Sequence, residues 1–282
     1  MEIIEAIILG IIQGLTEFIP ISSTGHLTVA GKLMNLISES NPEQWTAFIA
    51  VIQVGTLLAV LIYFWKDLLN ILKDFVRDLF INRKSFSEQS KNTMMGWYII
   101  IATIPVVLIG LGFKDIIEGA FTKNLFVISS SLIVLAVILA IAEKTGKFNR
   151  TINDIKWYDA LLIGIAQSFA LIPGSSRSGT TITAAIFLGF NRETAARFSF
   201  LMSIPAIAAS GLLQFYQALQ YIDYNGLIVL IISTIVSGIF GYLSIEFLLR
   251  YLRKKSTFIF IIYRILAGLI ILTMIYNGVI KP

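Results

Sequence analysis

Long uninterrupted apolar runs constrain this chain more than any other feature. Six stretches each come close to the roughly 20 residues that a helix needs to cross a bilayer. They cover residues 45–65, 94–113, 125–142, 195–216, 227–249 and 257–277. Only 14% of the residues are charged, against about 25% in soluble domains. Because the runs are continuous rather than alternating, the sequence predicts an all-α polytopic membrane protein and not a β-barrel.

Two further apolar regions, residues 3–37 and 158–190, are interrupted near the middle by proline and hydroxyl residues. We call these interruptions the first break (residues 18–26, FIPISSTGH) and the second break (residues 171–181, LIPGSSRSGTT). Each half of either region is too short to span a bilayer comfortably. Broken backbone at membrane depth is tolerated only where it is buried in protein or lines a cavity. We therefore predict two re-entrant helical hairpins, with two tilted spans per region as the alternative.

The distribution of basic residues predicts the orientation. If both hairpins return to the side from which they enter, 16 of the 22 Lys and Arg residues lie on loops of one side and four on the other. The positive-inside rule then places the loop 66–93 in the cytoplasm and both termini outside. The net charge of +5 is explained by these loops, so we expect no nucleic-acid partner. The chain has no cysteine, which excludes disulfides and cysteine-ligated metal sites.

The two breaks resemble each other in sequence. GIIQGLTEFIPISSTG (10–25) aligns with GIAQSFALIPGSSRSG (164–179) when one gap pairs Pro20 with Pro173 and the serines 22–23 with 175–176. Three candidate spans follow each copy, and an odd number inserts the second copy upside down. The sequence predicts a single membrane domain, residues 1–282, with an inverted repeat of residues 1–143 and 158–282 and a cytoplasmic loop at 66–93. Sites in such proteins form at the midplane, where broken helices meet.

The first break carries groups suited to phosphate chemistry. The hydroxyls that follow Pro20 are good N-caps, and a helix N-terminus attracts anions. Glu17 is a costly carboxylate in a membrane segment and lies four residues after Gln13, so the two side chains can ligate Mg²⁺ or Ca²⁺. His26, the only histidine, lies one turn after Ser23 and can serve it as general base or acid. The alternatives are hydroxyls that only cap a helix, and a carboxylate that orients the imidazole or faces an external vestibule.

The second break adds a permanent cation. Arg177 lies among hydroxyl residues at the tip of the predicted hairpin, and guanidinium binds phosphate with two parallel hydrogen bonds. We therefore predict that Arg177 clamps a phosphoryl group; the alternative is an arginine that snorkels to the interface. Arg264 is also intramembrane, and it either balances an acid or adds to the site. A site of this composition in a membrane cavity predicts a lipid substrate with a phosphate or diphosphate head.

Three motifs, QGLTE (13–17), PISSTGH (20–26) and PGSSRSGTT (173–181), resemble the signatures of the undecaprenyl-diphosphate phosphatase family, the bacitracin-resistance proteins. The resemblance extends to length, hydropathy and repeat. It implies hydrolysis of undecaprenyl diphosphate to the monophosphate, which recycles the carrier lipid of peptidoglycan synthesis and confers bacitracin resistance. The implied catalytic residues are Glu17, Ser23, His26 and Arg177. The residues implied to line the diphosphate site are Ser22, Thr24, Gly25, Gly174, Ser175, Ser176, Ser178 and Thr181.

The resemblance also implies a divalent cation, Mg²⁺ or Ca²⁺, at Gln13 and Glu17. Gln13 is the weaker ligand, since many members have Glu there. Whether Ser23 or an activated water attacks phosphorus stays open.

The expected partners are a polyprenyl diphosphate and membrane lipids, with bacitracin as a competitor for the substrate, and a homo-oligomer is allowed. The expected location is the bacterial cytoplasmic (inner) membrane, with the site reached from the extracytoplasmic side. A secondary transporter or lipid-carrier flippase with the same fold is the alternative function, and a dual role is left open.

Overall fold

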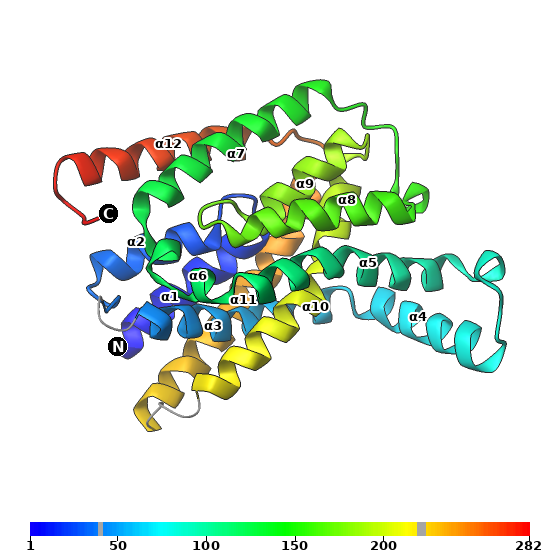
Figure 1. The fold of residues 1–282 in the computed structure, drawn as a ribbon, viewed down its shortest axis with the longest axis horizontal. Coiled ribbons are helices and arrows are strands. Elements are labelled where there is room, and N and C mark those ends of the chain that lie inside the picture. Colours follow the sequence, from blue (N-terminus) through cyan, green and yellow to red (C-terminus); the bar gives the residue numbers. More distant parts are fainter. Residues whose placement is uncertain (39–41, 219–223) are drawn as a thin grey trace.

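The computed structural model describes residues 1–38, 42–218 and 224–282, and over these ranges the chain is helical without a named strand. The helices are α1 (Ile3–Phe18), α2 (Ser23–Leu33), α3 (Pro42–Tyr63), α4 (Trp65–Val76), α5 (Lys91–Gly112), α6 (Lys114–Glu118), α7 (Leu125–Thr145), α8 (Trp157–Ser168), α9 (Arg177–Phe187), α10 (Arg192–Ala218), α11 (Tyr224–Leu252) and α12 (Phe258–Tyr276) (Figure 1). Within the described ranges, six of them, α3, α5, α7, α10, α11 and α12, are long and apolar enough to cross a membrane. The predicted all-α polytopic class is confirmed.

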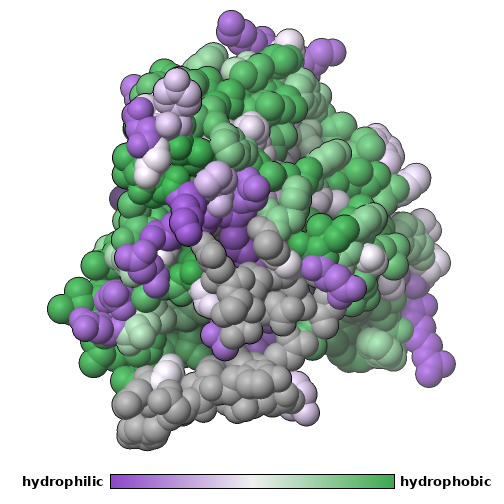
Figure 2. Space-filling view, turned by 60° about the vertical axis from the view of Figure 1, so that its left-hand side comes forward, coloured by the Kyte–Doolittle hydropathy of each residue, from purple (hydrophilic) through white to green (hydrophobic). Residues whose placement is uncertain are grey.

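The outer surface matches a lipid environment. Figure 2 shows hydrophobic side chains over most of the face in view, with hydrophilic side chains gathered near its middle and along its edges. Large apolar side chains such as Leu108 and Leu266 are more than half exposed. Exposed apolar area on this scale marks an interaction surface, and in a polytopic chain the partner is lipid.

The first apolar region folds as a hairpin of two short helices. Helix α1 has 16 residues and α2 has 11, so each is shorter than a membrane span. Lys32, near the end of α2, donates to the Lys281 carbonyl at 3.0 Å, and both termini lie at the same end of the molecule (Figure 1). The hairpin therefore returns to the end at which it starts, as the re-entrant prediction requires. Its depth in a bilayer stays a prediction.

The second apolar region also folds as a hairpin of two short helices. Helix α8 has 12 residues and α9 has 11. The Arg150 amide, before α8, donates to the Gly189 carbonyl, after α9, at 3.0 Å. Because residues on either side of this hairpin are hydrogen-bonded, it also returns to its starting point.

Corresponding glycines seat the two hairpins against their neighbours. A Cβ at Gly10 of α1 would lie 2.6 Å from the Ser233 carbonyl of α11, and a Cβ at Gly164 of α8 would lie 2.4 Å from the Ala102 carbonyl of α5. Only glycine allows backbones to approach so closely. Helix α1 packs on α11 and α8 packs on α5, which is the pairing that the predicted repeat requires. The inverted topology itself stays a prediction.

A polar connector joins α4 to α5 at the end of the molecule opposite the termini (Figure 1). It is closed by Asp78, which is buried and accepts from Lys84 Nζ at 2.8 Å, the Ser90 amide at 2.8 Å and Thr93 Oγ1 at 2.9 Å. The Lys84 ammonium and these two donors hold the pKa of Asp78 well below its usual range. The connector is thus an ordered element, and together with α4 it covers most of the predicted loop 66–93, which is therefore partly helical.

Candidate active site

The two breaks share one unusual backbone geometry. Ser22 caps α2 with φ 76°, and its hydroxyl accepts from the Gly25 amide at 3.2 Å. Ser176 caps α9 with φ 67°, and its hydroxyl accepts from the Gly179 amide at 3.1 Å. A positive φ is uncommon for serine and marks a functional constraint on the backbone. Each break therefore begins a helix with a serine cap of the same geometry.

This geometry corrects the gapped alignment of the breaks. The caps equate Ser22 with Ser176, and hence Ser23 with Arg177, without any gap. The alignment that pairs serines 22–23 with serines 175–176 is wrong because it follows the prolines rather than the caps. Gly174, with φ +85°, takes the place of Pro20. The Ser23 hydroxyl of the first break thus corresponds to the Arg177 guanidinium of the second.

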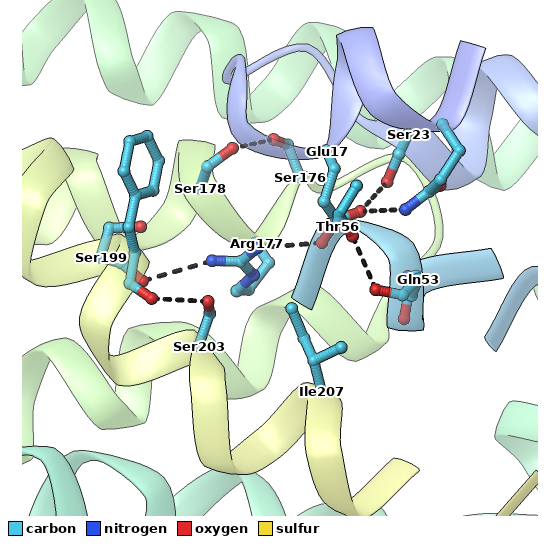
Figure 3. Close-up of polar contacts among 12 residues, drawn as sticks. Glu17, Ser23, Gln53, Thr56, Ser176, Arg177, Ser178, Ser199, Ser203 and Ile207 are labelled. Carbon is cyan, nitrogen blue, oxygen red and sulfur yellow. Dashed lines mark hydrogen bonds and ion pairs between the residues drawn. The ribbon is translucent and has the colours of Figure 1, made fainter. Parts of the chain in front are cut away.

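Glu17 is the centre of the polar cluster that joins the breaks. The carboxylate is 6% exposed. Its Oε1 accepts from Arg177 Nη2 at 2.9 Å, and its Oε2 accepts from Ser23 Oγ at 2.7 Å and from Gln13 Nε2 at 2.9 Å (Figure 3). Three of the four residues implied to be catalytic, Glu17, Ser23 and Arg177, are therefore in direct contact.

Arg177 is fixed by contacts on either side of its guanidinium. Beyond Glu17, it donates from Nη1 to the Ser199 carbonyl at 3.3 Å (Figure 3). Its Cζ lies 6.0 Å from the centre of the Phe18 ring. Thr181 braces this neighbourhood through a 2.6 Å contact between its Oγ1 and Ser199 Oγ. The arginine points into the site and does not snorkel, as the clamp prediction requires.

The remaining hydroxyls of the second break have mainly structural partners. Ser176 Oγ lies 3.2 Å from Ser178 Oγ, and Ser178 Oγ donates to the Ile19 carbonyl of the first break at 3.2 Å. Ser175 Oγ is fully buried without a hydrogen-bond partner among the described residues. Ser178 thus ties one break to the other.

Arg264 of α12 binds both breaks through their backbone. It is fully buried. Its Nη2 donates to the Ser175 carbonyl at 2.9 Å and to the Gly174 carbonyl at 3.4 Å, and its Nη1 donates to the Pro20 carbonyl at 3.4 Å. The sequence left open whether this arginine balances an acid or adds to the site. The structure shows a third role, in which it satisfies carbonyl groups that the proline turns expose.

His26 lies apart from the cluster. Its Nδ1 is 2.7 Å from the Ser22 carbonyl, so Nδ1 carries the proton, and its Nε2 is 2.6 Å from the Tyr263 hydroxyl of α12. The imidazole and phenol rings are stacked with their planes 12° apart. The predicted pairing of His26 with Ser23 is not what the structure shows: the hydroxyl donates to Glu17 instead. One turn of helix separates the residues, but the imidazole bonds back to the cap and outward to α12.

A cavity of about 410 Å³ opens onto the cluster. Its polar end is lined by Glu17, Ser23, Thr24 and Arg177, together with Ser22, Gly174 and Ser176. The rest is mostly apolar, with side chains such as Ile49, Val107, Ile207 and Leu213. These residues come from the early part of α3 and the later parts of α5 and α10, away from the connector. His26 is not among the lining residues.

The predicted cation ligands provide a partial site. Among the described residues no three His, Cys, Asp or Glu side chains cluster as metal ligands do. Gln13 points its Nε2 at Glu17, while its Oε1 is buried and lacks a hydrogen-bond partner in the described ranges. One carboxylate and neighbouring neutral oxygens fit Mg²⁺, which is usually held by one or two carboxylates plus substrate phosphates.

Sequence reasoning missed several residues that the structure places at the site. Gln53, Gln167 and Thr28 line the cavity, and Ser199 holds Arg177. The equivalence of Gln13 and Gln167 in the repeat was the available signal for Gln167. Ser199 and Tyr263 lie within ordinary apolar runs and carried no signal.

Comparisons with known proteins agree with the motifs. The family model described as bacitracin resistance protein BacA matches residues 6–270. A curated relative named undecaprenyl-diphosphatase, from Syntrophobacter fumaroxidans, is 52% identical over 99% of this chain and 100% of its own length. Proteins of the same name from Chloroherpeton thalassium and Chlorobium phaeovibrioides are 49% and 47% identical; this chain is covered to 99% and 100%, and the relatives to 98% and 100%.

Proposed function

Because the chain belongs to the bacitracin resistance protein BacA family, we infer that it is an undecaprenyl-diphosphatase. It is a membrane hydrolase that converts undecaprenyl diphosphate to undecaprenyl phosphate and inorganic phosphate. This reaction regenerates the carrier lipid of cell-wall synthesis and removes the diphosphate form of the lipid. Competition with bacitracin for that diphosphate, and assembly of the chain into an oligomer, stay predictions.

One observation carries the catalytic assignment: Glu17 joins Ser23 to Arg177 across the two breaks, at the polar end of a mostly apolar cavity. A diphosphate head fits the polar end, where the N-termini of α2 and α9 and the guanidinium offer positive charge. A prenyl chain fits the apolar remainder, where burial of each CH₂ is worth about 0.8 kcal/mol. The cavity thus accommodates both parts of a polyprenyl diphosphate.

We propose that substrate binding activates the cluster through Arg177. While its Nη2 is paired with Glu17 Oε1, the guanidinium is bound to the same carboxylate that accepts the hydrogen bond from Ser23 Oγ. A diphosphate attracts the guanidinium more strongly than a single carboxylate does, because it carries more charge and more acceptor oxygens. Transfer of the arginine to the phosphate frees Glu17 to accept a proton from Ser23.

In the proposed chemical step Ser23 Oγ attacks the terminal phosphorus and its proton passes to Glu17. The bond from that phosphorus to the bridging oxygen breaks, and undecaprenyl phosphate leaves with the bonding pair. Glu17 passes that proton to the departing phosphate oxygen and becomes a carboxylate again. A water then attacks the phosphoserine and gives a proton to Glu17, which returns it to Ser23 Oγ as inorganic phosphate is released. The 2.7 Å bond from Ser23 Oγ to Glu17 Oε2 supports the carboxylate, rather than His26, as the base. Direct attack by an activated water is the competing route.

A divalent cation, Mg²⁺ or Ca²⁺, is part of the proposal. Glu17 would hold it together with oxygens of the substrate, and Gln13 Oε1 is the additional ligand within the cluster. When bound, the cation supplies charge neutralisation at the diphosphate.

We also propose that the substrate enters from the extracytoplasmic side of the bacterial cytoplasmic membrane. The cavity is lined by helix ends remote from residues 66–93, the predicted loop, which carries basic residues such as Lys66, Lys73 and Arg77. The positive-inside rule places that loop in the cytoplasm. Labelling of a single cysteine at position 35 from the cytoplasmic face alone would contradict this orientation.

The deciding experiment is phosphate release from a polyprenyl diphosphate by the purified protein in detergent, with and without chelator. We expect release by the wild type, loss on chelation, and loss in Ser23→Ala and Glu17→Gln. A wild type that releases no phosphate but moves the lipid between leaflets of proteoliposomes would instead support the carrier alternative. Trapping of radiolabelled phosphate on the wild type, but not on Ser23→Ala, distinguishes serine attack from direct hydrolysis by water.

A further inference from the structure

Gln167 is a buried polar side chain that no step above uses. It lies in the last turn of α8, next to the end of the helix at Ser168, and leads into the second break. Gln167 is only 1% exposed. It lines the same cavity as Glu17, Ser23 and Arg177. Gln167 therefore borders the cavity in which the diphosphate head would bind.

Neither end of the Gln167 amide has a partner within the described residues. Both Nε2 and Oε1 are buried without a hydrogen bond. A glutamine amide offers two N–H donors and one acceptor oxygen, and a buried polar group without a hydrogen bond lowers the stability of the folded protein. Most buried polar atoms in proteins are paired, so an amide left in this state indicates a group that is selected for binding and not for stability.

The repeat-related glutamine shows why this amide is left over. In the first hairpin Gln13 donates from Nε2 to Glu17 Oε2, four residues further along the chain. The cap geometry equates Gln13 with Gln167 and Glu17 with Leu171. Because leucine stands where the first copy has a carboxylate, Gln167 has no acid to bond. Gln13 is thus hydrogen-bonded to Glu17 in the first hairpin, whereas the equivalent Gln167 of the second hairpin has an amide without a partner among the described residues.

The surroundings of Gln167 favour an anionic ligand. The cavity that Gln167 borders is also lined by Gly174, Ser176 and Arg177, and α9 begins at Arg177. A neutral amide adds donors to such a site without adding charge that would hold the product. Phosphate oxygens are acceptors, so the donor end of Gln167 suits them.

We propose that Gln167 is a substrate-positioning residue, whose Nε2 donates a hydrogen bond to a non-bridging oxygen of the diphosphate. This inference rests on the proposed phosphatase function and extends it to a residue of the second hairpin outside the break motif. The bond orients the terminal phosphorus toward Ser23, while Arg177 neutralises its charge. No proton is transferred to or from Gln167.

The test compares Gln167→Leu, Gln167→Glu and the control Ser168→Ala in detergent. Ser168 is the next residue of α8; its hydroxyl has only a 3.5 Å contact with the Gly164 carbonyl, and it does not line the cavity. A hydrogen bond to a charged group is worth about 1.5–3 kcal/mol, so we expect Gln167→Leu to lower kcat/KM about 10- to 100-fold, mainly through KM. Gln167→Glu should lower it further, since the carboxylate repels the diphosphate. Ser168→Ala should behave as the wild type.

A thermal melt supplies the readout that a merely structural role would not give. Because Gln167→Leu replaces an unpaired buried amide by an apolar side chain of similar size, its midpoint should equal or exceed that of the wild type. In the Ser23→Ala background, binding of methylenediphosphonate should weaken when Gln167 is replaced by Leu.

The outcomes separate the two proposals. A wild type without phosphate release overturns the phosphatase. An active wild type with Gln167→Leu at full kcat/KM, or with Gln167→Leu melting several degrees lower, overturns the role of Gln167 alone.

Discussion

The two breaks share one backbone conformation at their capping serines but carry different functional groups beside them. Each begins α2 or α9 with a serine at positive φ whose hydroxyl caps an amide three residues later. At the next position the first break has Ser23, with a transferable proton, and the second has Arg177, with a permanent charge. Five residues before the capping serine the first hairpin has Glu17, whereas the second has Leu171. The shared backbone geometry positions the two breaks in the same way, and the residues that differ between them form the proposed site.

This difference explains why neither break is sufficient. The first brings a hydroxyl and a carboxylate but no cation to neutralise a diphosphate. The second brings the cation but no group that can accept a proton. The contact of Glu17 with both Ser23 and Arg177 exists only because the two hairpins meet. A repeat with two identical breaks would bind an anion without reacting with it.

The largest effect is expected when the second break is made like the first by Arg177→Ser. This change removes the phosphate clamp and leaves Glu17 buried without its ion pair. A guanidinium supplies two charge-assisted hydrogen bonds to a phosphate, each worth about 1.5–3 kcal/mol, so kcat/KM for phosphate release should fall about a thousandfold. Arg177→Lys should recover part of the loss, because it keeps the charge but not the paired donors.

Arg192→Ser is the matched control for that prediction. Arg192 pairs with Glu143 away from the cavity, through Nε at 2.6 Å from Oε1. Its replacement breaks a comparable ion pair and should leave kcat/KM near the wild-type value. If Arg177→Ser and Arg192→Ser lose similar activity, the loss reflects folding and the assignment of Arg177 as the clamp is wrong.

The next largest effect is expected for Arg264, whose side chain hydrogen-bonds the backbone of both breaks. Arg264→Met should free the Pro20, Gly174 and Ser175 carbonyls at once. Each unpaired buried carbonyl costs about 1–3 kcal/mol, so the melting midpoint should fall by several degrees and activity by about 10- to 100-fold. Arg264→Lys should be intermediate. A melting midpoint of Arg264→Met equal to that of the wild type would show that the breaks are held by other contacts.

The sequence predicts the membrane spans and the positions of the breaks well, and it predicts the directions of the side chains poorly. The six spans follow from hydropathy, since a run of about 20 apolar residues has few other solutions in a membrane. Proline and hydroxyls locate both breaks, and the motif places Glu17, Ser23 and Arg177 together. The positive φ of Ser22 and Ser176 could not be foreseen, because it depends on the tertiary contacts that hold it.

Two predictions, the gapped alignment of the breaks and the pairing of His26 with Ser23, depended on backbone geometry that the sequence does not reveal. The gapped alignment pairs prolines, whereas the caps pair Ser23 with Arg177. His26 is near Ser23 by helical spacing, yet its imidazole bonds the Ser22 carbonyl and Tyr263. Arg264 was recognisable as an unusual intramembrane charge, but its backbone partners come from segments far away in sequence.

A smaller effect is expected for the histidine that only the first break has. If His26 positions the Ser22 turn, His26→Ala should lower kcat/KM about tenfold without changing the shape of its pH dependence. His26→Asn should restore part of the activity, since its amide can donate to the same carbonyl. Tyr263→Phe should cost less, about the 1 kcal/mol of one hydrogen bond. Loss of one limb of the pH profile in His26→Ala would establish proton transfer by the imidazole instead.

The smallest and most direct comparison is between the glycines that follow the two caps. A Cβ at Gly179 would lie 2.5 Å from Arg264 Nη1, whereas a Cβ at Gly25 would lie 3.2 Å from the Ile128 Cγ2 methyl. Arg264 is held by carbonyls of both breaks and cannot move freely, so Gly179→Ala should cost about 1–3 kcal/mol as overpacking does. The methyl group can give way, and Gly25→Ala should cost less. Melting midpoints of the two variants measure the difference; equal midpoints would mean that Arg264 does not constrain the second break more than the first.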